Sequence, residues 1–170
     1  AVLASIASSD NSVRLSSANN GSGTVIAELY DSTQSASFTA TTPRLVNVSV
    51  LKHLRTGLTA GFVIGGSTGK TVLIRAIGPT LDTVFGVGGV VADPQLALFN
   101  SSSAKIDEND NWGGTAALTT AFARVAAFAL AAPSRDAALV ATLPPGPYTV
   151  QVSGVNGTTG VALVEVYEIP

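Results

Sequence analysis

The loop from Asp107 to Gly114 reads Asp-Glu-Asn-Asp-Asn-Trp-Gly-Gly and offers the densest set of oxygen ligands in this 170-residue sequence. Asp107, Asn109 and Asn111 alternate along it, as the first ligands of a calcium loop do. The match is partial, because a Trp follows Asn111 where such a loop has Gly, and Leu118 stands where it has a bidentate Glu. Two interpretations therefore stay open: a calcium site, or an Asx-rich turn whose side chains cap backbone N–H groups.

A catalytic side chain usually acts together with a second polar side chain, and this sequence offers few such combinations. His53 is the only histidine, and there is no Cys to act as a nucleophile beside it. Ser67 does stand in a G-x-S-x-G spacing, but a nucleophile elbow also needs a following helix, and the residues from Thr71 onward are β-branched and apolar, as in a strand. Three of the few carboxylates, Asp107, Glu108 and Asp110, lie in one loop, so paired acids for glycoside cleavage are not indicated. We expect a protein that is not an enzyme, with His53 solvated near the end of a strand.

The segment from Gly65 to Thr71, Gly-Gly-Ser-Thr-Gly-Lys-Thr, resembles a phosphate-binding loop at first sight. That motif has four residues between its first Gly and the Gly-Lys-Thr, whereas Gly65 and Gly69 enclose three. The motif also needs a following helix, but the residues from Thr71 onward are β-branched and apolar, as in a strand. The segment is therefore predicted to be a glycine-rich hairpin turn.

Arg75 is the one charged residue in the apolar run that begins at Thr71. It could belong to a buried ion pair, or it could pack its stem on the sheet and extend its charge into solvent. The second arrangement is the commoner one, and we expect it here.

The amino-acid composition of the chain excludes several classes of binding partner and cofactor. Charged residues make up 12% of the chain and the formal net charge is −2, so no basic surface is expected for nucleic acid. No apolar run reaches the ~20 residues that span a bilayer. The absence of Cys excludes disulfides and thiolate metal sites, so no cofactor is expected apart from the calcium considered above. With abundant Ser, Thr, Asn and Gly, these features suggest an extracellular or cell-surface protein whose signal peptide has been removed.

Short runs rich in β-branched residues, separated by clusters of Gly, Pro, Asn and Ser, recur at the spacing of a sandwich. They predict strands at 12–17, 24–30, 44–51, 58–64, 70–77, 95–99, 104–107, 137–142, 147–153 and 161–168. A helix is expected within 115–129, where Leu118, Phe122, Val125 and Ala129 recur at intervals of four, three and four. The expected fold is mainly β: an antiparallel, jelly-roll-like β-sandwich with one short helix and an N-terminal β-hairpin extension.

An internal repeat relates the two ends of the chain. A shift of 137 positions, from 13 to 150, places residues 13–31 over residues 150–168 without a gap. Six pairs are identical: Val13 and Val150, Ser16 and Ser153, Asn19 and Asn156, Gly23 and Gly160, Glu28 and Glu165, Tyr30 and Tyr167. Both segments are therefore versions of one unit, which we expect to be a β-hairpin.

The repeat divides the chain into three parts: residues 1–31 as a β-hairpin extension, residues 32–42 as a Ser/Thr-rich linker, and residues 43–170 as the β-sandwich domain. A lone hairpin is marginal in water, and the equivalent place in the chain's own sandwich belongs to residues 148–168. We therefore expect the extension to pack on a neighbouring copy of the protein. Strand alternation assigns this self-assembly to its apolar residues Val13, Leu15, Val25, Ala27 and Leu29.

Four segments together resemble a module repeated in very large, predicted secreted bacterial proteins: GFVIGG at 61–66, KTVLIRAIGPTL at 70–81, ENDNWGG at 108–114 and LPPGPYTVQVSG at 143–154. The resemblance covers residues 43–170 and implies that residues 13–31 are the tail of a preceding module. More distantly, the chain is similar to the bacterial pre-peptidase C-terminal β-sandwich domains, which are accessory modules of secreted enzymes. Neither resemblance implies a catalytic residue in this chain.

Two functions follow as hypotheses. The first is an extracellular structural protein, a subunit of a fibre or surface array that forms head-to-tail with copies of itself and needs no nucleic acid or membrane span. The second is a non-catalytic accessory module of a larger secreted protein that binds carbohydrate or mediates adhesion. Beyond Trp112 and Tyr148 few aromatic residues are available to form a sugar-binding platform, which favours the first hypothesis.

Overall fold

The computed structural model describes residues 2–19, 21–39 and 41–170. The chain forms two units, Ala1–Leu45 and Val46–Pro170. The boundary between them lies close to the expected start of the sandwich at residue 43. The first unit contains one short 3-10 helix, η1 (Ser35–Ser37), and the second contains every strand.

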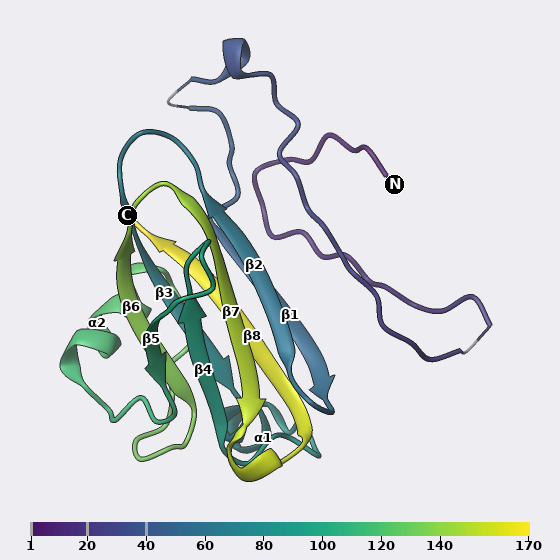
Figure 1. Cartoon of the computed structure of the whole chain (residues 1–170), viewed down its shortest axis with the longest axis vertical. Coiled ribbons are helices and arrows are strands. Elements are labelled where there is room, and N and C mark those ends of the chain that lie inside the picture. The colour runs from purple at the N-terminus through teal and green to yellow at the C-terminus, as the bar shows by residue number, and fades with distance from the viewer. Residues whose placement is uncertain (1, 20, 40) are drawn as a thin grey trace. The chain divides into compact units, whose positions relative to one another are not determined.

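Eight strands make up the second unit (Figure 1): β1 (Asn47–Leu54), β2 (Leu58–Ile64), β3 (Lys70–Ile77), β4 (Pro94–Phe99), β5 (Lys105–Asn109), β6 (Ala137–Leu143), β7 (Gly146–Gly154) and β8 (Gly160–Ile169). They form two antiparallel four-stranded sheets, with strand orders β1-β8-β3-β6 and β2-β7-β4-β5. Two sheets with these orders are a jelly roll, in which every connection crosses between the sheets except the one between β4 and β5. The expected β-sandwich is confirmed.

The main core lies between the sheets, because alternate residues of each strand point inward. In β7, for example, Tyr148, Val150 and Val152 are buried, while Gln151 is exposed. The central strand β3 is different, since its six residues from Val72 to Ile77 are all buried. Its outer face is covered by a second apolar cluster formed by Leu73, Ile77, Leu81, Trp112, Ala121, Phe122, Leu130, Ala138 and Ile169.

Two helices accompany the sheets, whereas one was expected. The expected helix, α2 (Ala116–Arg124), is shorter than the 115–129 window, and its N-cap Thr115 accepts a hydrogen bond from the Leu118 amide. The second, α1 (Pro79–Phe85), was missed. Its seven residues are too few to show helical periodicity, and the helix is marked only by Pro79 in its first turn and a left-handed Gly86 at its end.

The repeated unit is an arch and not a hairpin, which corrects the sequence interpretation. β7 belongs to the second sheet and β8 to the first, and the short helix η2 (Val155–Gly157) leads from one to the other. Crossing the ~10 Å between stacked sheets needs a longer connection than a two-residue hairpin turn. Spacing along the sequence does not distinguish these two arrangements.

Residues 12–17 and 24–30 were expected to be the strands of an N-terminal β-hairpin, and in the single chain they are not. The described residues before Asn47 contain no strand. An isolated strand pair has no second apolar layer against which to bury its face, so it gains little on pairing in water. Whether the segment forms strands on a neighbouring molecule stays a prediction.

Candidate functional site

The proposed calcium ligands Asp107 and Asn109 lie at the end of β5 with their side chains already engaged, and Asn111 follows in the next loop. Asp107 Oδ1 accepts a hydrogen bond from the Glu108 amide at 2.8 Å. Asn109 Oδ1 accepts one from the Ala138 amide at 3.0 Å, while its Nδ2 donates to the Asn111 carbonyl at 3.0 Å. Asn109 therefore joins the end of β5 to β6 through its side-chain oxygen and to the following loop through its NH2 group. Among the described residues, no three His, Cys, Asp or Glu side chains lie close enough together to hold a metal ion.

Because Asp107 and Asn109 already have hydrogen-bond partners, we expect EDTA to leave the melting temperature unchanged. A calcium ion bound only to the folded chain would stabilise it by mass action, so its removal would lower the melting temperature. Asn109→Ala should lower the melting temperature equally with calcium and with EDTA, because it removes the hydrogen bond from Ala138 of β6 and the one to the Asn111 carbonyl. Differential scanning calorimetry at matched ionic strength measures both effects. A clear fall in the melting temperature of the parent protein on chelation, reversed by added calcium, would restore the calcium interpretation.

The aromatic residues considered for sugar binding are buried. Trp112 packs against Phe122 with ring centroids 5.5 Å apart, and its indole N–H donates to the Ala131 carbonyl at 3.2 Å and to Ser134 Oγ at 3.1 Å. Tyr148 lies in the core between the sheets and donates its hydroxyl to the Pro144 carbonyl. Neither ring is therefore available as a flat platform for a sugar.

The outer face of the first sheet holds a buried ion pair that the sequence analysis judged the less common arrangement. Arg75 is completely buried on β3, and its Nε and Nη2 donate to Glu165 Oε2 on β8 at 2.8 Å and 2.5 Å. Arg75 Nη1 donates to the Phe128 carbonyl at 2.6 Å. The expectation of an exposed guanidinium was wrong, because the segments that follow β5 and α2 cover this face of β3 with apolar side chains.

Aromatic rings and a hydrogen bond from Tyr167 to Glu165 complete this cluster. The guanidinium carbon of Arg75 lies 4.3 Å from the Phe128 ring centroid and 5.0 Å from that of Phe122. Tyr167 donates its hydroxyl to Glu165 Oε1 at 2.8 Å. Burial, and then the Glu165 charge, raise the pKa of Tyr167 to about 12, so the phenol is protonated at neutral pH. Arg75 and Glu165 are buried in this cluster, whereas Phe128 and Tyr167 are partly exposed, and the hydrogen bond to the Phe128 carbonyl attaches the chain after α2 to the sheet.

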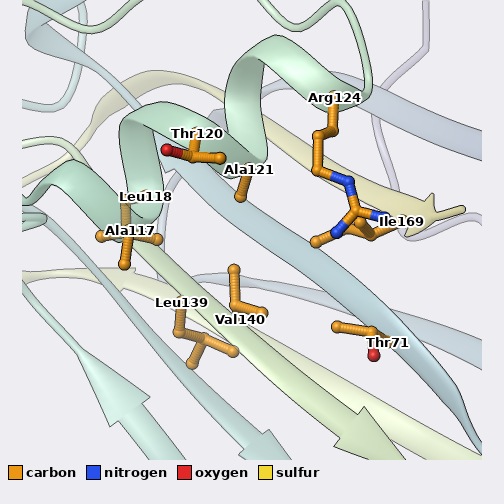
Figure 2. A pocket seen from close by; sticks show the side chains of 9 residues that line it. All are labelled: Thr71, Ala117, Leu118, Thr120, Ala121, Arg124, Leu139, Val140 and Ile169. Atoms are coloured by element: carbon orange, nitrogen blue, oxygen red, sulfur yellow. The ribbon is translucent and has the colours of Figure 1, made fainter.

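A hollow of about 380 Å³ lies between α2 and the outer face of β3, β6 and β8 (Figure 2). Arg124 is the only charged residue on its walls, and two threonine hydroxyls are its other polar side-chain groups. General acid–base catalysis needs a titratable group such as His, Asp or Glu, and the lining offers none. The walls are formed by Thr71, Ala117, Leu118, Thr120, Ala121, Arg124, Leu139, Val140 and Ile169.

The other residues considered for chemistry lie apart from this hollow. His53 is exposed on the edge strand β1, opposite Val161 of β8. The glycine-rich segment that begins at Gly65 connects β2 to β3, so a strand follows it as expected. The predicted hairpin turn was wrong, because β2 and β3 lie in different sheets. No helix in the described part of the chain is long and apolar enough to cross a membrane.

The five predicted self-assembly residues are all exposed in the first unit, including Val13 at 79% and Val25 at 68%. Their counterparts in the repeat, Val150, Val152, Ala162, Val164 and Val166, all face the core between the sheets. The polar residues of the unit keep their contact, since Tyr30 donates to Glu28 Oε1 at 3.1 Å, as Tyr167 does to Glu165. This hydrogen bond is the main reason that the pKa of Tyr30 is raised.

Comparison with known proteins adds a fold likeness. No family model matches the sequence, and no curated protein matches it. Among solved structures, the chain is similar to the pre-peptidase C-terminal domain of a collagenase from Bacillus anthracis, with a TM-score of 0.43 and 13% identity. That match covers 71% of this chain and 89% of the collagenase domain. The assignment of a mainly β sandwich rests on the strand pairing of the chain itself.

Proposed function

We propose that this protein is a non-catalytic structural subunit that assembles head-to-tail with copies of itself at the cell surface or outside the cell, residues 13–31 being donated as strands to a neighbour. One observation carries the proposal. The segment exposes apolar residues such as Leu15 (58%) and Leu29 (62%), although the related segment at the other end of the chain buries its apolar face in a sandwich. As strands, these residues would form one apolar face, and a contiguous apolar face is typical of an interaction site.

The energetics favour a weak single interface that is reinforced by others. Burying Val13, Leu15, Val25 and Leu29 contributes roughly 1.5–3 kcal/mol each, or about 6–12 kcal/mol in all. Association costs on the order of 4–15 kcal/mol in lost translational and rotational freedom, so these four side chains alone make the interface marginal. Because a head-to-tail contact between unlike surfaces does not close on itself, repeated addition gives a filament.

The residues that line the hollow, and the position of His53, support the non-catalytic part of the proposal. The hollow beneath α2 lacks a general base among its lining residues, and His53 is exposed at a sheet edge. The accessory-module alternative finds less support, because Trp112 and Tyr148 are used in packing.

Deleting residues 1–31 should turn an assembling protein into a monomer with an intact sandwich, because both apolar clusters lie within Val46–Pro170. Sedimentation velocity of the two chains over a range of concentrations, with negative-stain microscopy of the full chain, measures this. Leu29→Asp should weaken assembly at least 10-fold, since it places a charge on the apolar face.

Leu3→Asp is the matched control, because Leu3 is also exposed but lies outside the repeated unit. It should leave assembly unchanged. Identical assemblies from the truncated chain, or a full chain that stays monomeric at high concentration, would favour the accessory-module function instead.

A further inference from the structure

The residues that the two repeated units share are those that a complete sandwich requires. Asn156 has φ 54° and ψ 27°, a left-handed conformation that Asn tolerates better than most residues, and its counterpart is Asn19. Gly160 lies so close to the preceding loop that a Cβ would meet the Val90 carbonyl carbon at 2.5 Å, and its counterpart is Gly23. The first constraint belongs to the β7–β8 connection itself, and the second arises where that connection meets residues 89–90.

The Glu and Tyr that the two repeated units share support the same conclusion. Glu165 and Tyr167 lie on the outer face of β8, where they hold the guanidinium of Arg75 in a buried site. A carboxylate is costly to bury unless a cation accompanies it. Glu28 and Tyr30 repeat this pair at the same spacing, which fits a position beside an arginine better than a position on an exposed sheet edge.

We propose that residues 13–31 are built to occupy the β7–β8 position of a second copy of this sandwich, with Glu28 bound to the buried arginine equivalent to Arg75. This inference rests on the proposed strand donation and specifies its receptor. The chain's own residues 146–170 occupy that position in the structure, so the receiving copy is one whose last two strands have not docked.

The apolar side chains of the segment fit this position. Val25 and Ala27 would replace Ala162 and Val164, which keeps the total volume of the two neighbouring inward sites. Leu29 would replace Val166, which is only partly buried and tolerates one more methylene. The connection also matches, since residues 18–22 have the same length as residues 155–159.

The first test is a graft in the full chain, in which the sequence of residues 13–31 replaces residues 150–168. We expect one cooperative thermal transition, lowered by less than about 10 °C, the shift that one or two kcal/mol produces in a domain of this size. In the grafted chain, Glu28→Ala, now at position 165, should lower the melting temperature much further. Arg14→Gln, now at position 151, restores the exposed Gln of the parent chain and should not. A graft without a cooperative transition overturns the proposal.

The second test removes the resident strands. A chain of residues 1–145 should unfold cooperatively, because residues 13–31 can complete its sandwich, whereas a chain of residues 32–145 should not. With Ala27→Cys and Ala76→Cys in the longer chain, a disulfide should form, because Ala76 pairs with Val164, the counterpart of Ala27. A segment added outside β1 would be separated from β3 by β1 itself and could not form this bond. The protein contains no other cysteine.

On a non-reducing gel, a disulfide-linked dimer supports donation to a second copy, whereas a disulfide within one chain overturns it. A chain of residues 1–145 that lacks the transition or the disulfide overturns it. Neither result depends on polymerisation of the full chain, so failure of the assembly proposal, seen by sedimentation, is a separate outcome.

Discussion

Arg75→Ala should lower the free energy of unfolding by about 3–5 kcal/mol, the usual cost of leaving one member of a buried ion pair without its partner. Arg75 is completely buried and Glu165 nearly so, and the variant would leave the Glu165 carboxylate beside Tyr167 with no cation. It would also remove the donor that holds the Phe128 carbonyl and the cation that contacts the Phe128 ring.

Equilibrium urea unfolding measures this loss. Lys105→Ala is the control, because Lys105 forms an exposed ion pair with Glu108, and exposed pairs contribute ~0–1 kcal/mol. The double variant Arg75→Met with Glu165→Leu should recover most of the stability, since a buried pair replaced by apolar residues is often neutral. A loss below about 1 kcal/mol for Arg75→Ala would show that the pair is solvated in solution.

Asp136→Ala should have the second largest effect, a loss of about 2–5 kcal/mol, because it leaves buried donors without an acceptor. The Asp136 carboxylate is fully buried and accepts hydrogen bonds from the Gly78 amide at 2.8 Å and from the Thr80 amide at 3.3 Å. It also accepts hydrogen bonds from the Thr80 hydroxyl and, at 2.7 Å, from Ser134 Oγ. One side chain therefore ties the start of α1 to the segment before β6.

The variant Asp136→Asn keeps the shape of the side chain but removes one of its two hydrogen-bond acceptors. The amide retains one oxygen for the Gly78 amide but presents an NH2 group to the Thr80 backbone N–H, so an intermediate loss is expected. Hydrogen exchange should place the fastest-opening amides of the Ala variant in α1, at residues 79–85. Equal stability of the parent, Asn and Ala variants in urea would contradict this role of Asp136.

The strands were predictable because strand formation leaves a local signal. Runs of alternating or β-branched residues between turn residues placed eight strands within about three residues of their observed ends. The strand after the glycine-rich segment was predictable for the same reason, but the hairpin turn expected there was wrong, because β2 and β3 lie in different sheets. The capped start of α2 at Thr115 likewise depends on neighbouring residues alone.

The candidate site was less predictable. The repeat identified residues 13–31 and their apolar face, because gapless identity is visible without a structure. It did not explain why Glu28 and Tyr30 are repeated, since the meaning of that pair depends on Arg75, which is 90 residues away from Glu165 in the chain. Burial of Arg75 in turn depends on the cover supplied by Phe122 and Phe128.

The sequence by itself determined the class of this protein: a strand-rich chain with one detectable helix, a repeated terminal unit, and no constellation of catalytic residues. Only the tertiary structure decided that consecutive strands β7 and β8 lie in different sheets, that Arg75 is buried against Glu165, and that Asn109 and Trp112 are committed to packing. The physical reason is the range of the interactions. Alternation and turn chemistry act over a few neighbouring residues, whereas sheet order and the burial of a charge are decided by segments that meet only after the chain has folded.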